Sequence, residues 1–485
     1  MSGIMVLAVV SEIYPLIKTG GLADVAGALA GALAAEGVAV VTLVPGYPAV
    51  MSKINAAETV LTEPDLFGGG ARVLRASAAG LDLFVLDAPH LFARAGGPYA
   101  GPDGRDWPDN PFRFGALCQI AARLAFGECP HFRPDVVHGH DWQAGLTAAY
   151  LVYDGRPRPA TVITIHNLAF QGQYPVALLA SLGLPPRALV LDGVEYYGMI
   201  GFLKAGLALS DRITTVSPAY AAEIRTPEYG MGLDGLLRAR SDSLIGIVNG
   251  IDDAVWNPRQ DAWLAAPYSI ETRARRGLNK TALQKLFGLA VDQDALLFGV
   301  VSRLAWQKGI DLILANLDLI EQIGGQLAVL GSGEPSLEEA FHAAAKARPG
   351  RVSAMIGYDE RAAHMIQAGA DALLIPSRFE PCGLTQLCAM RYGAVPVAAR
   401  VGGLTDTIID ANEMAIASGL GTGVLFSPVT SGALGAALQR TRRLWDAPKV
   451  LDRIRANGMN TDVSWHRPAA AYARLFRELS ATSPR

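Results

Sequence analysis

Short apolar runs that alternate with helical patterns constrain the fold of this chain more than any other feature of its sequence. In the first half the runs are Val38–Val44, Leu81–Leu86, Asp135–His138, Thr161–Ile165, Arg212–Val216 and Leu244–Ile247. In the second half they are Leu296–Val301, Gln326–Leu330, Val352–Ile356, Ala372–Ile375 and Val395–Ala398. Such alternation predicts parallel sheets with helices on both faces. At 485 residues the chain is long enough for two or three domains, each with its own core.

The alternation is interrupted just after VNGID (Val248–Asp252), where WNP and a polar segment follow. We therefore predict an α/β protein with two doubly wound, Rossmann-like domains that face each other across a deep cleft. The first domain would span residues 1–250 and the second 251–456. Residues 457–485 would form a helical tail that crosses back to the first domain.

Charge and cysteine content argue against several classes of partner. The net charge is −3, from 42 basic and 45 acidic residues without a long basic run, which argues against a nucleic-acid partner. The four cysteines show neither a CxxC pair nor zinc-ligand spacing, so a reducing, cytoplasmic setting fits. The N-terminal apolar run soon meets Glu12, which indicates a strand and not a signal peptide. The uncharged stretch Ala415–Gln439 carries repeated Gly, Ser and Thr with Pro428, so we expect no membrane partner.

The turn KTGGL (Lys18–Leu22) lies directly between a predicted strand and an alanine-rich helix. It is neither G-x-x-x-x-G-K-[ST] nor G-x-G-x-x-G, because the lysine precedes two adjacent glycines. Unpaired backbone N–H groups at a helix N-terminus suit an anion, and glycines let a ligand come close to the backbone. Taken alone, the turn is equally well an ordinary strand-to-helix connection with an exposed lysine.

Further polar side chains follow other predicted strands at their carboxyl ends. These are His138, His140 and Asp141 in HGHDW, His166 and Asn167 in TIHN, Arg303 and Lys308 in SRLAWQKG, and Arg378 and Glu380 in SRFEPCGL. Ligands of doubly wound sheets bind at such ends, and two ends facing across a cleft would bring these groups into one site. A lone histidine is more often structural, but the shared placement favours a functional role for these groups and for Lys18.

The charges in these motifs suit one kind of chemistry. Lys18, Arg303 and Lys308 would bind a diphosphate, above all a departing one whose negative charge grows in the transition state. Glu380 would bind sugar hydroxyls or stabilise charge. Alternatively, it is only a glutamate at the start of a helix, where the helix dipole favours a negative charge. The sequence has no HExxH pattern, no DxD pair and no Rossmann glycine fingerprint, so we expect neither a bound metal nor dehydrogenase chemistry.

A set of motifs together resembles bacterial glycogen synthases and plant starch synthases. In chain order they are SEIYPLIKTGGLADV, HGHDWQAG, TIHNLAFQG, VNGID, SRLAWQKGID, SRFEPCGLTQ and GGLTDT. They run from residue 11 to about residue 407, and DVSWHRPA near the C-terminus fits the same family. The resemblance implies the two-domain GT-B fold, with the acceptor on the first domain and the nucleotide sugar on the second.

The resemblance also implies transfer of glucose from ADP-glucose to the non-reducing end of an α-1,4-glucan, with retention of configuration and release of ADP. Arg303 and Lys308 would then neutralise the leaving diphosphate, and Glu380 would bind the transferred glucose. His166 would lie beside that glucose, and Asp141 would lie nearer the acceptor. The remaining substrate-binding candidates are Glu12, Lys18, Thr19, Gly20, Gly21, Tyr99, Asn167, Asn249, Gly357, Tyr358, Cys382, Gly383, Leu384 and Thr385.

The ribose site and the mechanism stay open. Many GT-B enzymes carry a second glutamate eight residues after the first, and this chain has Cys388 there; glycogen synthases commonly lack that glutamate. A retaining glycosidase would hold a nucleophilic carboxylate near an acid, but the loop carboxylates Glu380 and Asp141 include no obvious nucleophile. Same-face attack by the glucan hydroxyl as the diphosphate departs needs no enzymic nucleophile, and we favour it over a double displacement.

Two rival functions are compatible with the same fold. A glucan phosphorylase would need a lysine-bound pyridoxal phosphate, and no C-terminal lysine motif supports that cofactor. A glucan- or nucleotide-sensing protein without turnover is disfavoured, because this chain keeps every charged group of the predicted diphosphate site. We therefore expect ADP-glucose and glycogen or another α-1,4-glucan as partners, with no cofactor. The sequence specifies neither the oligomeric state nor a preference for ADP- over UDP-glucose.

Overall fold

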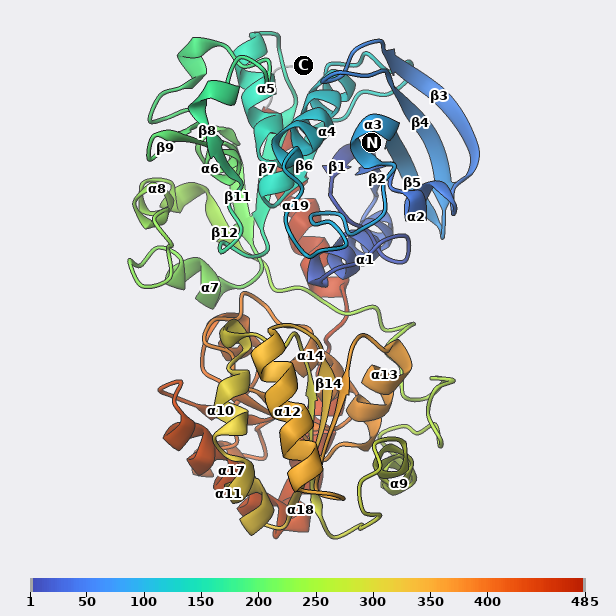
Figure 1. Ribbon diagram of the computed structural model, residues 1–485, viewed down its shortest axis with the longest axis vertical. Helices are drawn as coiled ribbons and strands as arrows, with labels where there is room; N and C mark the ends of the chain where they lie inside the picture. Colours follow the sequence, from blue (N-terminus) through green and yellow to red (C-terminus); the bar gives the residue numbers. More distant parts are fainter. Residues whose placement is uncertain (1–2, 483–485) are drawn as a thin grey trace. The chain divides into compact units, whose positions relative to one another are not determined.

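The computed structural model describes residues 3–482 and divides into two compact units. The first unit runs to Asn249 and takes up the chain again from Trp465, and the second covers Gly250–Ser464. Each unit is built around its own sheet (Figure 1). Each also has its own hydrophobic core.

A large, mostly parallel sheet forms the centre of the first unit. In spatial order its strands are β12 (Leu244–Gly246), β11 (Arg212–Thr215), β7 (Ala160–Ile165), β6 (Val136–His140), β1 (Ile4–Val9), β2 (Val38–Pro45), β5 (Leu81–Asp87), β4 (Ala71–Ala78) and β3 (Asn55–Glu63). Neighbours from β12 to β5 pair in parallel, whereas β4 and β3 form an antiparallel edge (Figure 1). A separate small antiparallel sheet contains β8 (Gln173–Pro175), β10 (Met199–Gly201) and β9 (Glu195–Tyr196).

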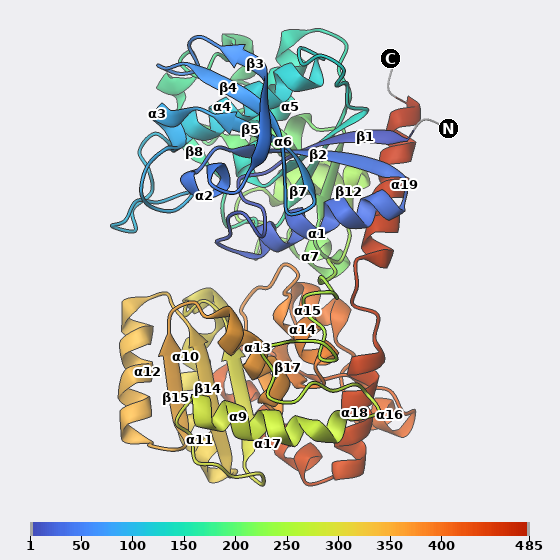
Figure 2. The ribbon, with the colours of Figure 1, turned by 90° about the vertical axis from the view of Figure 1, so that its right-hand side faces the viewer.

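Helices cover both faces of the first sheet. They are α1 (Gly21–Ala35), α2 (Pro48–Met51), α3 (Pro89–Phe92), α4 (Asn110–Ala125), α5 (Leu146–Asp154), α6 (Phe202–Leu209), α7 (Pro218–Glu223), α8 (Asp234–Ala239) and α19 (His466–Thr482). Figure 2 shows α19 alongside α1 and the start of β1, far from both in the sequence. Tyr472 and Phe476 of α19 share a buried apolar cluster with Val25 and Leu29 of α1, which holds this helix on the first unit.

The antiparallel edge and the small sheet differ from the all-parallel prediction. Most residues of β3 are exposed, so this strand lacks the buried apolar run by which parallel strands are found in a sequence. Exposed residues alternate irregularly with buried ones in β4, and the strands of the small sheet are only two or three residues long. Edge strands of this kind carry a weak sequence signal because one of their faces is open to water.

The sheet of the second unit is parallel throughout. In spatial order its strands are β15 (Val352–Ile356), β14 (Gly325–Gly331), β13 (Leu296–Val301), β16 (Ala372–Ile375), β17 (Val395–Ala399) and β18 (Val424–Phe426). Its helices are α9 (Arg276–Leu286), α10 (Ile310–Leu314), α11 (Leu317–Gln322), α12 (Pro335–Ala347), α13 (Glu360–Gly369), α14 (Thr385–Arg391), α15 (Gly402–Thr407), α16 (Glu413–Ala417), α17 (Ser431–Trp445) and α18 (Pro448–Asn460). They cover both faces of the sheet, as in a doubly wound fold (Figure 2).

Each sheet has a point where the direction of winding reverses. In the first unit the chain moves from β1 outward to β2, and later returns to place β6 on the other side of β1. In the second unit the corresponding pair is β13 and β16. Ligands of open α/β sheets bind outside the carboxyl ends of the strands at such a switch point. The loops that follow β1, β6, β13 and β16 are therefore where a site is expected in each unit.

Candidate functional site

An internal carboxylate closes the turn between β1 and α1. Glu12 is only 3% exposed, and its Oε2 accepts hydrogen bonds from the backbone N–H groups of Thr19 and Gly20, the latter at 3.3 Å. The Thr19 hydroxyl donates to the same oxygen at 2.9 Å. Two backbone donors that the sequence assigned to a diphosphate thus already hold a carboxylate, which suits the start of a helix for the same electrostatic reason.

Tyr99 completes the surroundings of Glu12. Its hydroxyl donates to Oε1 of Glu12 at 3.0 Å and lies 2.8 Å from the hydroxyl of Ser11. Burial raises the pKa of the Glu12 carboxyl, while the hydrogen bonds from Thr19, Tyr99 and Gly20 oppose that shift. In this structure Glu12 and Tyr99 act as supports of the turn.

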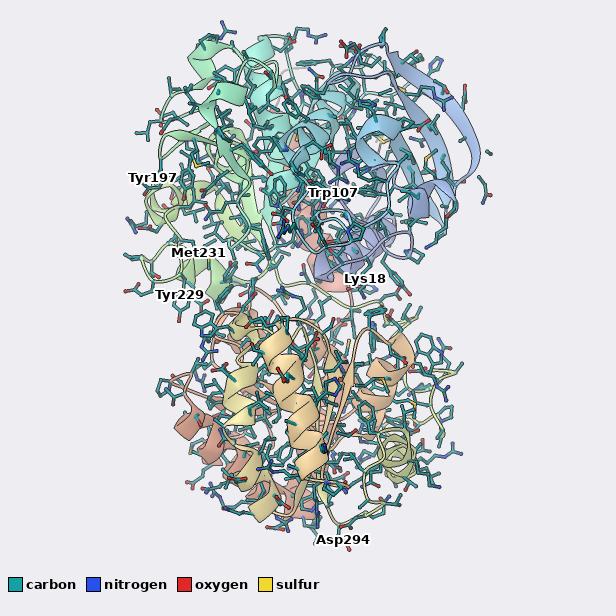
Figure 3. All side chains as sticks on the ribbon, viewed as in Figure 1. Lys18, Trp107, Tyr197, Tyr229, Met231 and Asp294 are labelled. Atoms are coloured by element: carbon teal, nitrogen blue, oxygen red, sulfur yellow. The ribbon has the colours of Figure 1, made fainter. Side chains whose placement is uncertain are left out.

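Lys18 lies at the start of this turn and stays partly exposed. Its Nζ forms an ion pair of 2.8 Å with Asp24 in the first turn of α1 and lies 5.4 Å from the centre of the Tyr14 ring. Figure 3 shows Lys18 at the margin of the first unit, near α1. Because its side chain is 24% exposed, solvent reaches the ion pair, and an anionic ligand would compete with Asp24 for the ammonium.

Asp141 connects the loops that follow β6 and β7. Its backbone has φ +55°, a conformation that non-glycine residues rarely adopt. The carboxylate accepts hydrogen bonds from the backbone N–H groups of His166 at 2.7 Å and Asn167 at 3.4 Å. Burial raises the pKa of Asp141 to about 7, against the effect of these two hydrogen bonds, and the nearby Glu12 carboxylate raises it further. The Glu12 carboxylate is therefore close enough to Asp141 for its charge to affect the ionisation of Asp141.

Three histidines lie side by side next to Asp141. Nε2 of His138 lies 2.6 Å from the Thr164 hydroxyl, and Nδ1 of His140 lies 2.9 Å from Nε2 of His166. Burial lowers the pKa of all three imidazoles, that of His140 to about 3. The rings are therefore neutral near pH 7, and His166 can bind a sugar hydroxyl without adding charge.

The two asparagine candidates have different surroundings. Asn167 accepts a hydrogen bond from the Ala169 N–H at 3.1 Å and so closes the turn after β7. Asn249 is 6% exposed, and its Oδ1 has no hydrogen-bond partner within residues 3–482. A buried, unpaired carbonyl oxygen is costly, which makes Asn249 a candidate for a ligand hydroxyl.

In the second unit, Lys308 and Glu380 form a close ion pair. Nζ of Lys308 lies 2.6 Å from Oε2 of Glu380, and the Ser377 hydroxyl donates to the same oxygen at 2.9 Å. The Glu380 side chain is 8% exposed and that of Lys308 20%. The structure thus brings together two residues, 72 positions apart, that the sequence assigned to the leaving diphosphate and the transferred glucose.

Two glycines let the loops that carry this pair approach closely. Gly309 has φ +66°, and a Cβ there would lie 2.0 Å from the Pro376 carbonyl oxygen. The loop after β13 therefore packs against the loop after β16 only because residue 309 is glycine. A Cβ on Gly403 would lie 2.4 Å from backbone atoms of Cys382, and the Gly403 N–H donates to the Glu380 carbonyl at 3.0 Å. Gly309 is the glycine of the QKG motif, and Gly403 belongs to the GGLTDT motif.

The turn after Glu380 leads into α14. Gly383 has φ +72°, and the Gln386 amide donates to the carbonyls of Cys382 and Gly383, both at 2.9 Å. Leu384 precedes the first residue of α14, Thr385, whose hydroxyl contacts the Val301 carbonyl of β13 at 3.5 Å. The predicted phosphate-binding turn is therefore fixed to the end of β13.

Arg303 and the residues predicted near the nucleoside are more exposed. Arg303 follows β13 and donates from Nη2 to the Gln307 side chain at 3.2 Å. Gly357 follows β15 with φ +136°, and the Tyr358 ring is 73% exposed with its hydroxyl bonded to Glu360. An exposed aromatic ring at a strand's carboxyl end is suited to stacking on a planar base.

The surroundings of two further residues considered in the sequence, Arg378 and Cys388, indicate structural roles. Arg378 donates two hydrogen bonds of 2.7 Å to Asp311 and packs over the Trp306 ring at 4.5 Å. Cys388 is 3% exposed in an apolar cluster with Leu387 and Met390. Neither surrounding suggests a ligand role, and the partner of the ribose is still unassigned.

The sequence reasoning missed several supporting groups. Asp24, Ser377 and Gln307 each bond a candidate residue, and a single sequence does not show that side chains of this kind meet. Within residues 3–482, no group of three or more His, Cys, Asp and Glu side chains is placed to hold a metal ion. No helix in that range has both the length and the apolar character needed to cross a membrane.

Comparison with protein families identifies the class. Residues 5–239 match the family model of the starch synthase catalytic domain, and residues 284–459 match that of glycosyl transferases group 1. A sucrose-phosphate synthase from Thermosynechococcus elongatus shares the fold, with a TM-score of 0.59 at 19% identity over 99% of this chain and 100% of that chain. The two Rossmann-like units and the charged groups at their switch points are those of a glycosyltransferase of the GT-B fold.

Full-length relatives narrow the class to one family. A glycogen synthase from Methylocella silvestris is 71% identical over 479 residues, which cover 99% of each chain. One from Rhodopseudomonas palustris is 62% identical over 481 residues, covering 99% of this chain and 98% of the relative. The catalytic domain of starch synthase IV from Arabidopsis thaliana, solved with ADP and acarbose, has a TM-score of 0.89 at 30% identity and covers 99% of this chain and 100% of that chain. The chain belongs to the glycogen synthase family.

Proposed function

We propose that this chain transfers glucose from ADP-glucose to the non-reducing end of an α-1,4-glucan, with retention of configuration and release of ADP. The observation that carries the proposal is the Lys308–Glu380 ion pair at the switch point of the second unit. The related starch synthase IV was solved with ADP and acarbose, which supports ADP as the nucleotide of the donor.

In this proposal the second unit binds the donor. Lys308 and Arg303 neutralise the diphosphate, whose charge increases as the bond to glucose breaks. Glu380 holds Lys308 in place and accepts hydrogen bonds from the glucosyl group. The exposed Tyr358 ring stacks on the base. The glucosyl group and the acceptor are bound by three residues of the first unit, His166, Asp141 and Asn249. Lys18 contributes a further positive charge.

The proposed step needs no enzymic nucleophile. The bond between the anomeric carbon and the diphosphate oxygen breaks, and its electron pair leaves with ADP. The 4-hydroxyl oxygen of the glucan then bonds to the same face of the anomeric carbon, and its proton passes to the departing phosphate oxygen. This route agrees with the carboxylate surroundings, because Asp141 and Glu380 are held by hydrogen bonds or a cation.

The proposal includes no metal ion and no pyridoxal phosphate, since lysine and arginine side chains supply the positive charge. We also propose that the protein acts in the cytoplasm. Its four cysteines are buried thiols that are not joined in disulfides, which is the state expected in a reducing compartment.

The test is a release assay with purified protein, glycogen and either ADP-glucose or UDP-glucose. We expect nucleotide release that depends on glycogen, is faster with ADP-glucose, and continues in the presence of a chelator. Labelled glucose should appear at the non-reducing ends of the glucan. Absence of glycogen-dependent release with both donors would refute the proposal, and activity that disappears with chelator would refute its metal-free part.

A further inference from the structure

Gln307 joins the loop after β13 to the loop after β16. Its backbone carbonyl accepts a hydrogen bond from the Arg378 N–H at 2.8 Å, and its side-chain Nε2 donates to the Phe379 carbonyl at 3.3 Å. Nη1 of Arg378 also donates to the carbonyl of Trp306 at 2.6 Å. Because Phe379 directly precedes Glu380, Gln307 is anchored on the segment that leads into this carboxylate.

The oxygen of the same amide holds Arg303. Nη2 of Arg303 donates to Oε1 of Gln307 at 3.2 Å, and the two residues are four positions apart in the loop after β13. Arg303 itself is exposed to water. Since Gln307 is bonded to the neighbouring loop through both its backbone and its side chain, it ties this exposed guanidinium to the loop that carries Glu380.

The two partners fix the orientation of the Gln307 amide. The guanidinium of Arg303 has only donor groups, and the backbone carbonyl of Phe379 can only accept. An amide turned end for end would place its NH2 group against the guanidinium and its oxygen against the carbonyl, so both hydrogen bonds would be lost. The positions of Oε1 beside Arg303 and Nε2 beside Phe379 therefore follow from the chemistry of the partners.

Arg303 also differs from the other cations of the predicted diphosphate site in the charge of its partner. Lys18 pairs with Asp24 at 2.8 Å and Lys308 with Glu380 at 2.6 Å. Within residues 3–482 the guanidinium of Arg303 forms no ion pair, and its hydrogen-bond partner is a neutral amide. A carboxylate partner competes with an anionic ligand for the cation, whereas an amide holds the guanidinium without offsetting its charge.

We propose that Gln307 is a positioning residue, which holds the guanidinium of Arg303 through a neutral amide in the place where it meets the diphosphate of the donor. The inference rests on the proposed function, which assigns a diphosphate to Arg303. An arginine side chain free in water loses rotamer freedom when it binds a ligand, and a side chain that is already held loses less.

A double-mutant cycle between Gln307 and Arg303 tests the inference. Gln307→Met has nearly the length of glutamine and removes both hydrogen bonds of the amide, and it is made in the wild-type and in the Arg303→Ala background. Gln307→Glu can still accept from Arg303 but adds a counter-charge. Gln322→Met is the matched control, because Gln322 is an exposed glutamine of α11 that precedes the amino end of β14, at the opposite edge of the sheet.

We expect Gln307→Met to lower kcat/KM for ADP-glucose about tenfold, the lower end of the effect of a hydrogen bond to a charged group, because Arg303 is exposed. In the Arg303→Ala background the same change should cost less than about twofold, since the group through which Gln307 acts is absent. The dissociation constant of ADP, measured by calorimetry, should show the same dependence on Arg303. Gln307→Glu should raise that constant more than Gln307→Met does, and Gln322→Met should leave both quantities unchanged.

Equal losses from Gln307→Met with and without Arg303 would show that Gln307 only supports the loops, and would overturn the inference. ADP binding as tight in Gln307→Glu as in the wild-type protein would also overturn it. If Gln307→Met does not fold, Gln307→Asn replaces it in the cycle, because its amide is one methylene too short to reach both partners. A wild-type protein that binds ADP but transfers no glucose would refute the proposed function instead, and the calorimetric cycle would still decide the role of Gln307.

Discussion

Substitution of Lys308 tests whether its ammonium group acts in catalysis or only supports the fold. Its Nζ lies 2.6 Å from Glu380, whose side chain is 8% exposed. In Lys308→Ala the Glu380 carboxylate keeps the hydrogen bond of 2.9 Å from Ser377 but loses this counter-charge. The variant should therefore affect both the free energy of unfolding and turnover, for different reasons.

The size of each effect follows from burial and from the proposed role. Removing one partner of a fully buried ion pair costs about 3–5 kcal/mol, whereas exposed pairs contribute about 0–1 kcal/mol. Because Lys308 is 20% exposed, we expect Lys308→Ala to lower the unfolding free energy of the second unit by about 2 kcal/mol. The double variant Lys308→Ala/Glu380→Gln removes the stranded charge and should regain about 1 kcal/mol. Loss of a cation at the leaving diphosphate should lower kcat by about 10²–10³, and the double variant should not recover it.

The assays are guanidinium unfolding and steady-state release of ADP. Lys285→Ala is a matched control, because Lys285 is an exposed lysine of α9 in the same unit. It should change the unfolding free energy by less than about 0.5 kcal/mol and leave the kinetics unchanged. If the double variant regains kcat together with stability, or if Lys308→Ala raises only KM, Lys308 is a structural cation and the reasoning is wrong.

Three further variants test other parts of the site. Glu380→Gln keeps the size of the side chain and the hydrogen bond from Ser377, so its free energy of unfolding should lie within about 1 kcal/mol of the wild-type value. Its kcat should fall by about 10² or more. Normal turnover in the release assay would contradict the role of Glu380. Lys18→Ala should lower kcat/KM for ADP-glucose by about tenfold, and Lys18→Arg should restore only part of it because a guanidinium fork is not a compact ammonium; wild-type kinetics would make KTGGL an ordinary turn. Asp141→Asn tests the raised pKa of about 7, set against the ordinary value of 3.8. The folded protein holds an extra proton between these values, so the contribution of Asp141 to stability falls as pH rises from about 4 to about 7. The side chain of the variant does not ionise, so its free energy of unfolding in urea should rise by about 2–3 kcal/mol relative to that of wild type between about pH 5 and pH 7.5. A difference in unfolding free energy that does not depend on pH would contradict the raised pKa.

The sheet of the second unit was predictable in detail from the sequence. The apolar runs Leu296–Val301, Val352–Ile356 and Ala372–Ile375 have the same bounds as β13, β15 and β16. Strands of a parallel sheet covered by helices are apolar on both faces, so the carboxyl ends of these three strands coincide with the first serine, glycine or proline that follows the apolar run. The antiparallel edge β3–β4 was not predicted, because its exposed positions break the apolar run.

The candidate site was predictable as a set of loops but not as a set of contacts. Parallel strands place the residues that follow them at one edge of the sheet, so the positions of Lys308 and Glu380 after β13 and β16 followed from counting. That Glu12 occupies the backbone donors of the KTGGL turn was not evident, because the acceptor lies seven residues before Thr19 and has to fold back. The bond between His140 and His166 likewise depends on the register of β6 against β7, which pairs His140 with Thr164.

The sequence by itself determined the βα alternation, the family motifs and the edge of each sheet at which polar groups gather, because these depend on local periodicity and on chain direction. Tertiary structure alone decided which groups meet: Lys18 with Asp24, Lys308 with Glu380, and His140 with His166. Such pairings depend on ångström-scale distances set by loop packing, as where Gly309 admits the carbonyl of Pro376. Charge, tautomer and pKa follow from those distances and from burial, which local sequence does not specify.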